Sequence, residues 1–213
     1  MIKAIIFDVD NTLINTGRIS TRAYIETAKQ LGLKQVPARE IRKMFGIPSR
    51  IIIKKFWPKI DIKKFQRIEH QKILAKKVKE IPGAKQVVKQ LYKKYTLGLL
   101  SSKTRILMYP HLKQINLSEK FFKFIYSSDD LRYHKPNPKV FSKAFKELNF
   151  KRNEILYIGD SIHDFKATKK ANLNFIAVLT GTYKKRDFKR IGIKDNNVLK
   201  SIKYLPQWLE KNG

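Results

Sequence analysis

Two aspartates, Asp8 and Asp10, follow a short apolar run at the start of the chain. The run, residues 3–7, is rich in β-branched and aromatic residues and too short for a helix, so it predicts a buried parallel strand that ends at Asp8. Ligands of open α/β sheets bind beyond the carboxyl ends of the strands, and neighbouring carboxylates there need a cation or a proton to offset their repulsion. The pair therefore indicates an active site with a positive group beside Asp8.

Later segments place other polar groups after predicted strands: a hydroxyl at Ser101, an ammonium at Lys135, and carboxylates at Asp160 and Asp164. Two carboxylate clusters on different strands can share one hard cation, and Mg²⁺ suits a site with few carboxylates. The chain has no cysteine and only four dispersed histidines, which argues against zinc. The hydroxyl and the ammonium suit an anion such as a phosphoryl group.

These groups together fit phosphoryl transfer. That reaction needs an in-line nucleophile, neutralisation of the equatorial oxygens, and a proton for the leaving oxygen. We assign nucleophilic attack to Asp8 and proton donation to Asp10. Thr12 either orients Asp10 through a hydrogen bond or caps the following turn.

The elements that must position these residues alternate between strand and helix. Strands are predicted at residues 3–7, 96–101, 124–127, 154–158 and 174–179. Helices are predicted at residues 84–95, 138–148, 162–172 and 199–211. The alternation predicts an α/β fold with a Rossmann-like parallel sheet, right-handed crossovers and helices on both faces.

Between the first two strands the apolar spacing is helical throughout. Helices are predicted at residues 18–33, 39–45, 49–57 and 61–79, and Gly32 is expected to stop the first of them. We therefore predict a core formed by residues 1–16 and 80–213, with an inserted helical cap at residues 17–79.

The charge of the chain is strongly positive, with 47 Lys and Arg against 17 Asp and Glu, a formal net charge of +30. Such a field attracts polyanions and steers phosphorylated substrates. The basic residues are spread along the chain without a block of five or six, so we favour a solvated surface over a nucleic-acid partner. The chain has no stretch of 18 apolar residues and no signal-peptide pattern, which predicts a soluble, cytoplasmic protein without a membrane partner.

Four segments in order resemble the motifs of the haloacid dehalogenase-like superfamily: Asp8-Val-Asp10-Asn-Thr12, Leu100-Ser101, Lys135-Pro136, and Gly159-Asp160-Ser-Ile-His-Asp164. The resemblance covers about residues 3–182. Because helices follow the first motif, the chain is most similar to the phosphoglycolate phosphatase-like branch, which carries a type C1 helical cap.

The resemblance implies a Mg²⁺-dependent phosphatase that forms an aspartyl phosphate on Asp8. It implies that Mg²⁺ is bound by Asp8, the backbone carbonyl of Asp10 and Asp160, with Asp164 completing or orienting the site. The implied partner is a small phosphorylated substrate, such as phosphoglycolate, a sugar phosphate, a nucleotide or pyrophosphate. Two alternatives stay open, a phosphohexomutase of the same fold and a nucleic-acid-associated basic protein.

The resemblance also assigns the phosphoryl oxygens to Ser101 and Lys135. Ser102 stands where many relatives have Asn, and His134 stands where Gly is common. We therefore expect these two positions to affect which substrate binds. We assign substrate binding to Ser102 and, in the cap, to Arg50. Asn172 replaces a usual Gly and is expected to keep a left-handed helix stop.

Overall fold

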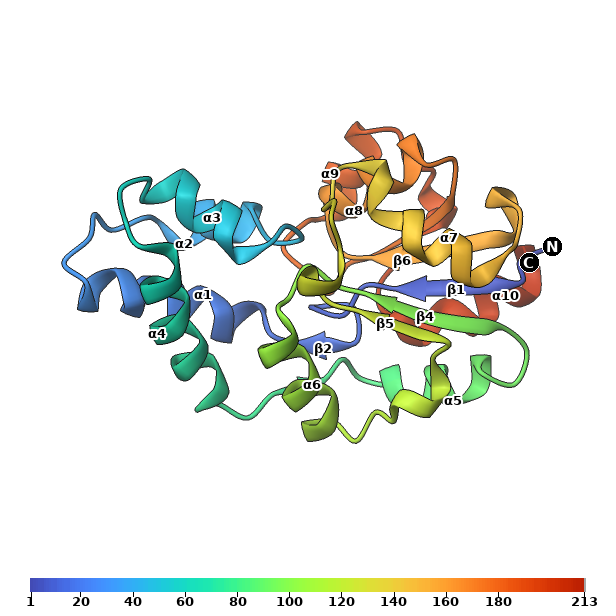
Figure 1. Ribbon diagram of the computed structural model, residues 1–213. Coiled ribbons are helices and arrows are strands. Elements are labelled where there is room, and N and C mark those ends of the chain that lie inside the picture. The colour runs from blue at the N-terminus through green and yellow to red at the C-terminus, as the bar shows by residue number, and fades with distance from the viewer. Residues whose placement is uncertain (213) are drawn as a thin grey trace.

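A six-stranded parallel sheet forms the centre of the computed structural model, which describes residues 1–212 (Figure 1). The strand order is β5-β4-β1-β6-β7-β8, and every neighbouring pair is parallel. The strands are β1 (Ala4–Phe7), β4 (Thr96–Leu100), β5 (Phe124–Tyr126), β6 (Ile155–Gly159), β7 (Asn174–Val178) and β8 (Val198–Leu199). This topology confirms the α/β class and places the ends of β4, β1 and β6 side by side.

Helices cover both faces of the sheet because the side chains of each strand alternate between them. Ile5 and Phe7 of β1 face one hydrophobic cluster, while Ala4 and Ile6 face the other. The first cluster is covered by α5 (Ala84–Leu91), α6 (Arg105–Gln114) and α10 (Leu205–Asn212). The second is covered by α7 (Ser142–Leu148), α8 (Ile162–Lys170) and α9 (Lys185–Arg190).

Four helices between β1 and β4 form a lobe at one end of the sheet (Figure 1). They are α1 (Gly17–Gln30), α2 (Ala38–Lys43), α3 (Ser49–Phe56) and α4 (Ile62–Leu74). The lobe has its own hydrophobic cluster, in which the rings of Trp57 and Phe65 stack with centroids 4.9 Å apart. A short antiparallel ribbon of β2 (Ile14–Asn15) and β3 (Lys79–Glu80) joins the lobe to the sheet. We call residues 17–79 the cap and the remainder the core.

The structure corrects several predicted elements. The sheet has a sixth strand, β8, in place of the start of the predicted helix 199–211, and α10 begins only at Leu205. The helix predicted at 61–79 ends at Leu74, because residues 79–80 pair with β2. Both errors involve two-residue strands, which are fixed by distant partners and are too short to show a period of two. In one of these contacts, the Leu179 N–H donates to the Leu199 carbonyl at 3.0 Å.

Two helices, α6 and α9, were not predicted from the sequence. Pro110 lies inside α6 and interrupts its helical pattern, and α9 has only six residues. The helix predicted at 84–95 ends at Leu91, and the first turn of that predicted at 138–148 is a 3₁₀ helix. The 3₁₀ helices are Glu119–Phe121, Ser128–Asp130, Pro138–Phe141, Arg152–Glu154, Asp195–Asn197 and Ile202–Tyr204.

Two predicted helix stops are confirmed. Gly32 has φ 64° just beyond α1, and Asn172 has φ 56° just beyond α8. Within residues 1–212, no helix combines the length and apolar character needed to cross a membrane.

Candidate active site

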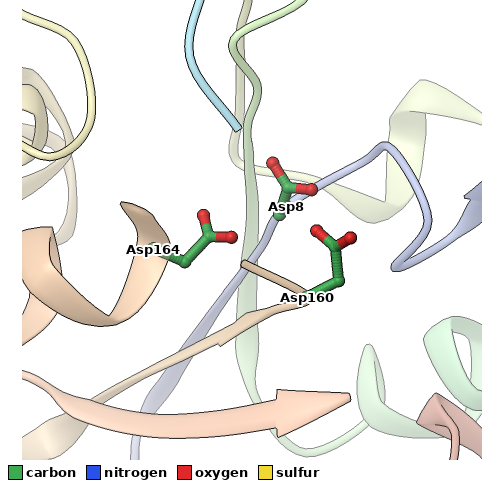
Figure 2. A group of neighbouring side chains, drawn as sticks. All are labelled: Asp8, Asp160 and Asp164. Atoms are coloured by element: carbon green, nitrogen blue, oxygen red, sulfur yellow. The ribbon is translucent and has the colours of Figure 1, made fainter. Parts of the chain in front are cut away.

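Three carboxyl groups from two strand ends and one helix meet at the edge of the sheet. Asp8 follows β1, Asp160 follows β6, and Asp164 lies in the first turn of α8. All three are buried, and one carboxylate oxygen of each lies within 4.8 Å of the others. Figure 2 shows the three carboxyl groups pointing toward one another. The structure thus brings together three of the four aspartates that the sequence assigned to a metal.

Local hydrogen bonds hold these side chains in place. The Asp8 N–H donates to the Ile158 carbonyl at 2.8 Å, which continues the β1–β6 ladder to the site. Ser161 and Asp164 form a capping box at the start of α8: the Ser161 hydroxyl donates to Asp164 Oδ2 at 2.6 Å and accepts from the Asp164 N–H at 3.2 Å. The residue types that start this helix therefore also fix the Asp164 carboxyl.

Lys135 supplies the positive group expected beside Asp8. Its Nζ lies 2.6 Å from Asp8 Oδ1 and 2.7 Å from Asp164 Oδ1, and it donates to the Tyr157 hydroxyl at 3.0 Å. The residue is 1% exposed. Burial opposes its charge, but Asp164 and Asp8 outweigh this effect and raise the pKa of Lys135 well above its ordinary value. Lys135 is therefore a permanent cation within the cluster.

Asp160 has no comparable partner. In residues 1–212 its carboxylate has one hydrogen bond, a long one of 3.4 Å from Asn11 Nδ2. Burial raises the pKa of Asp160, and the carboxylates of Asp8 and Asp164 raise it further. Burial also raises the pKa of Asp8, despite the opposing effect of Lys135. An oxygen-seeking cation between Asp8 and Asp160 would relieve this repulsion, so these residues fit a divalent metal.

Asp10 is held apart from the cluster by partners that the sequence analysis missed. Its Oδ1 lies 2.7 Å from Lys103 Nζ and accepts a hydrogen bond from Thr16 Oγ1 at 2.5 Å. Burial favours its neutral form, but Lys103 and Thr16 prevail and lower the pKa of Asp10. Thr12 does not orient Asp10 as one of our alternatives held, because its buried Oγ1 has no hydrogen-bond partner among the described residues.

Asp8, Asp10 and Asp160 line a cavity of about 80 Å³ between the core and the cap. Tyr24, Phe45, Ile52, Glu69 and Ile73 of the cap also line it. A water molecule takes up ~30 Å³ of liquid, so this space has room for only a few waters or a small group. Ser102 and Lys103 line the cavity, whereas Ser101, Lys135 and Asp164 do not.

The two hydroxyls after β4 have different surroundings. Ser101 is 1% exposed, and its Oγ accepts from the Lys103 N–H at 3.1 Å. Ser102 donates its hydroxyl to the Gly46 carbonyl of the cap at 2.7 Å.

Arg50, which the sequence assigned to substrate binding, does not line this cavity; its Nη2 lies 2.5 Å from His134 Nε2. Ser102 and His134, two positions where the chain departs from the family pattern, therefore both hold the cap to the core.

Glu69 is an unexpected acid in the wall of the cavity. It is 2% exposed, and its Oε2 has no hydrogen-bond partner within residues 1–212. Burial raises the pKa of Glu69 from 4.5 to about 8; Lys103 partly opposes this and Asp10 adds to it. Its neighbour His70 has Nε2 3.6 Å from Glu69 Oε2. At neutral pH this cavity wall therefore presents a neutral carboxyl group, which does not repel an anionic substrate.

Glu69→Gln is expected to flatten the pH dependence of stability between pH 5 and pH 8. In that window the folded protein keeps the Glu69 proton while the unfolded chain releases it, so stability falls as pH rises, by up to ~1.4 kcal/mol per pH unit. Urea unfolding at pH 5, 6.5 and 8 measures the slope. The exposed Glu210→Gln on α10 serves as the control and should leave the slope unchanged. Equal slopes for Glu69→Gln and wild type would contradict the raised pKa.

Gly181 lies against the Asp160 carboxyl, in the loop after β7. A Cβ at this position would stand 1.8 Å from Asp160 Oδ2 and 2.6 Å from its Cγ. Gly181→Ala should displace the carboxyl and lower divalent-metal affinity by ~10–100-fold, the usual effect of disturbing a metal ligand's support. Metal titration by calorimetry measures this effect, with Thr182→Ser in the same loop as the control. Unchanged affinity in the folded variant would remove Asp160 from the metal site.

The site residues that were not predicted from the sequence do not belong to any recognisable motif. Lys103 follows the predicted hydroxyls by one or two positions and is one of 36 lysines, so its type gave no signal. Thr16 precedes α1, where a hydroxyl is commonly a cap, although here it makes no capping bond. Glu69 reaches the cavity only through the packing of α4.

Comparison with known proteins gives consistent similarities. Residues 5–178 match the family model described as haloacid dehalogenase-like hydrolase. The chain is 31% identical to pyrophosphatase PpaX of Anoxybacillus flavithermus over 177 residues, covering 80% of each sequence. A solved hydrolase from Pseudomonas syringae has a TM-score of 0.87 at 22% identity, covering 100% of this chain and 99% of that one. CbbY from Rhodobacter sphaeroides, solved with phosphate, has a TM-score of 0.81 at 21% identity, covering 96% of both chains.

Proposed function

Because this chain belongs to the haloacid dehalogenase-like hydrolase family, we propose that it is a Mg²⁺-dependent phosphatase that transfers the phosphoryl group of a small metabolite first to Asp8 and then to water. One observation carries the proposal: Asp8, Asp10 and Asp160 all line one small cavity, and Lys135, outside the lining, contacts Asp8 at 2.6 Å. A nucleophile, a proton-transfer group and compensating charges are thereby available to one phosphoryl group.

In the first step, an oxygen of Asp8 attacks phosphorus, and the bond from phosphorus to the leaving oxygen breaks. Asp10 gives a proton to that oxygen. In the second step, Asp10 takes a proton from water as the water oxygen attacks phosphorus, and the bond to Asp8 breaks to release inorganic phosphate.

Asp10 is suited to its second role by the groups that contact it. Lys103 and Thr16 favour its ionised form, which is the form of a base. To act as an acid, Asp10 must first be protonated, which requires its contact with Lys103 to weaken once substrate is bound. The phosphoryl oxygens of the substrate are a second anionic group that Lys103 can contact. Lys103 therefore shifts from Asp10 toward the substrate, in our proposal, and so raises the tendency of Asp10 to hold a proton.

The metal would be held by Asp8 and Asp160, with the Asp10 backbone carbonyl as a further oxygen ligand and Asp164 supporting the site. When bound, Mg²⁺ supplies positive charge to the phosphoryl oxygens. Lys135 already neutralises part of the cluster, holding Asp8 and Asp164 together through contacts of 2.6 and 2.7 Å. The family resemblance implies that the Ser101 hydroxyl also binds the phosphoryl group.

The size of the cavity favours the smallest substrates considered, phosphoglycolate and pyrophosphate. Its volume of about 80 Å³ is well below the ~300–1,000 Å³ of sites that enclose drug-sized ligands. A nucleotide base would require the cap to move away. Tyr24, Phe45 and Ile52 line the space on the cap side and, in our proposal, limit the access of bulk water to the reacting group.

Phosphate release from a panel of substrates tests the proposal. Pyrophosphate, phosphoglycolate, sugar phosphates, nucleoside monophosphates and an aryl phosphate are each assayed with Mg²⁺ and with a chelator. We expect Mg²⁺-dependent release, fastest with pyrophosphate or phosphoglycolate. Interconversion of sugar-phosphate isomers without release of phosphate would favour a mutase. Absence of phosphate release from every substrate of the panel would contradict phosphatase activity.

A further inference from the structure

A second and larger cavity lies between the cap and the core, with a volume of about 1050 Å³. Its walls come from the start of α1, from α2, from the loop after β7 and from α9. The Tyr183 hydroxyl donates to the Lys43 carbonyl at 2.9 Å and so joins the two walls. We call this cavity the arginine cleft.

Arginine is concentrated in this cleft. Five of the 11 arginines in the chain line it, but only two of the 36 lysines. If the basic residues of the cleft only reflected the composition of the chain, most of them would be lysines, because lysine is far more common than arginine in this sequence. The planar guanidinium binds phosphate through two parallel hydrogen bonds, which the lysine ammonium does not. The choice of residue therefore indicates phosphate recognition beyond general charge.

Most of these cations have no acidic partner. Lys43 pairs with Glu40 at 2.8 Å. Within residues 1–212, the six other basic side chains of the cleft form no ion pair within 4.0 Å: Arg18, Arg39, Arg42, Lys184, Arg186 and Arg190. The only acid in the lining is Asp187. The mutual repulsion of these cations therefore favours the binding of an anion in the cleft.

We propose that the arginine cleft binds a compact anion that carries several phosphoryl groups, such as a short oligophosphate, and that this anion holds the cap against the core. Arg39 and Arg42 on α2 reach it from the cap, and Arg186 and Arg190 on α9 from the core. A volume of about 1050 Å³ matches the upper range of small-ligand sites, ~1,000 Å³.

The lining distinguishes this ligand from a nucleic acid. Proteins that bind single strands combine positive grooves with aromatic side chains on which bases stack. Tyr183 is the sole aromatic residue among those that line the cleft, and its hydroxyl is already bonded to the cap. The cleft therefore offers contacts for phosphates and no platform for bases.

The cleft is separate from the catalytic cavity, although Asn11 lines both. Asn11 accepts from the Gly17 N–H at 2.9 Å and donates to Asp160 at 3.4 Å, so its side chain stands between the two spaces. The proposal goes beyond the phosphatase function and does not depend on it, because an anion can be bound here whether or not Asp8 reacts.

Binding of inorganic tripolyphosphate to the metal-free protein tests the proposal. The cleft variant is Arg39→Glu/Arg186→Glu, which changes one exposed arginine on each wall. The control, Lys93→Glu/Lys94→Glu, changes two exposed lysines just after α5, on the other side of the core (Figure 1). Each double variant lowers the net charge by four, and about 0.15 M salt screens distant charges beyond ~8 Å. Calorimetry measures affinity, and circular dichroism checks the fold.

We expect the cleft variant to bind tripolyphosphate at least tenfold more weakly than wild type, and the control to differ less than about twofold. Tripolyphosphate should also raise the thermal midpoint of wild type but not of the cleft variant, since a ligand of the folded state stabilises it. If the double variant does not fold, Arg186→Gln alone should still weaken binding severalfold.

Three results would overturn the proposal. Absence of tripolyphosphate binding to wild type would show that the cleft is no oligophosphate site. Equal weakening in both double variants would assign the binding to overall charge. Tighter binding of a single-stranded DNA decamer than of tripolyphosphate, lost only in the cleft variant, would make the cleft a nucleic-acid site.

Discussion

Asp8→Asn is expected to abolish phosphate release, with a loss of at least ~10⁴-fold in turnover, while the protein remains folded. The amide matches the carboxyl group in shape but does not form the acyl phosphate, so both chemical steps are blocked. Lys135 keeps its contact with Asp164 at 2.7 Å, and the cavity keeps its walls. Phosphate release with Mg²⁺ and the substrate that wild type prefers is the measurement.

The stability of this variant separates loss of chemistry from loss of fold. Burial raises the pKa of Asp8 above its ordinary value, so the folded state disfavours its ionised form. For an acid whose folded pKa is raised, stability is lost as pH rises through the interval between the unfolded and folded pKa. A neutral amide removes that loss, so the thermal midpoint of metal-free Asp8→Asn at pH 8 should equal or exceed that of wild type.

Asp195→Asn is the matched control for the nucleophile. Asp195 is exposed and lies 3.2 Å from Lys185 in a surface ion pair, where such pairs contribute ~0–1 kcal/mol. Its replacement should leave turnover within about twofold of wild type. Substantial turnover by a folded Asp8→Asn protein would mean that another group accepts the phosphoryl or that water attacks directly.

Asp8 and Asp160, which stand at strand ends, are the site residues with the strongest local signal in the sequence. Asp8 and Asp160 each follow a run that is too short and too apolar for anything but a buried strand, and the carboxyl ends of parallel strands share one edge. That argument leads directly to the cluster of Figure 2. Their roles in binding metal and in catalysis stay predictions until tested.

The residues that the sequence could not locate depend on how the cap lies against the core. Arg50 was expected at the substrate, but it contacts His134. Packing between the cap and the core decides which face of α3 meets the core, and the sequence of α3 alone does not show this. Glu69 reaches the cavity for the same reason, whereas Lys103 is a core residue that contacts Asp10 and whose type gave no signal. The ribbon of β2 and β3 has the same origin: its two strands are more than 60 residues apart, beyond the reach of any local pattern.

Lys135→Met is expected to reduce the free energy of unfolding of the metal-free protein by ~3–5 kcal/mol at pH 7, the usual result of removing one member of a buried ion pair. The substitution keeps much of the side-chain volume but leaves Asp8 and Asp164 without the ammonium that lies between them. Lowering the pH should shrink the deficit, because burial raises the pKa of Asp8 and its protonated carboxyl group no longer repels Asp164. Turnover should also fall by ~10²–10³, since a positive group beside the reacting phosphoryl is lost.

Two further variants distinguish charge compensation from simple packing. Tyr157→Phe removes a hydroxyl that accepts from Lys135 at 3.0 Å and should cost only ~1 kcal/mol. Lys135→Met/Asp164→Asn removes a cation and an anion together, so it should be more stable than the sum of the single losses predicts, by ~0.5–3 kcal/mol. Strict additivity, or a Lys135→Met loss no larger than that of Tyr157→Phe, would contradict this assignment. A deficit in Lys135→Met that Mg²⁺ partly restores would show that metal and ammonium neutralise the same carboxylates, because either cation relieves their repulsion.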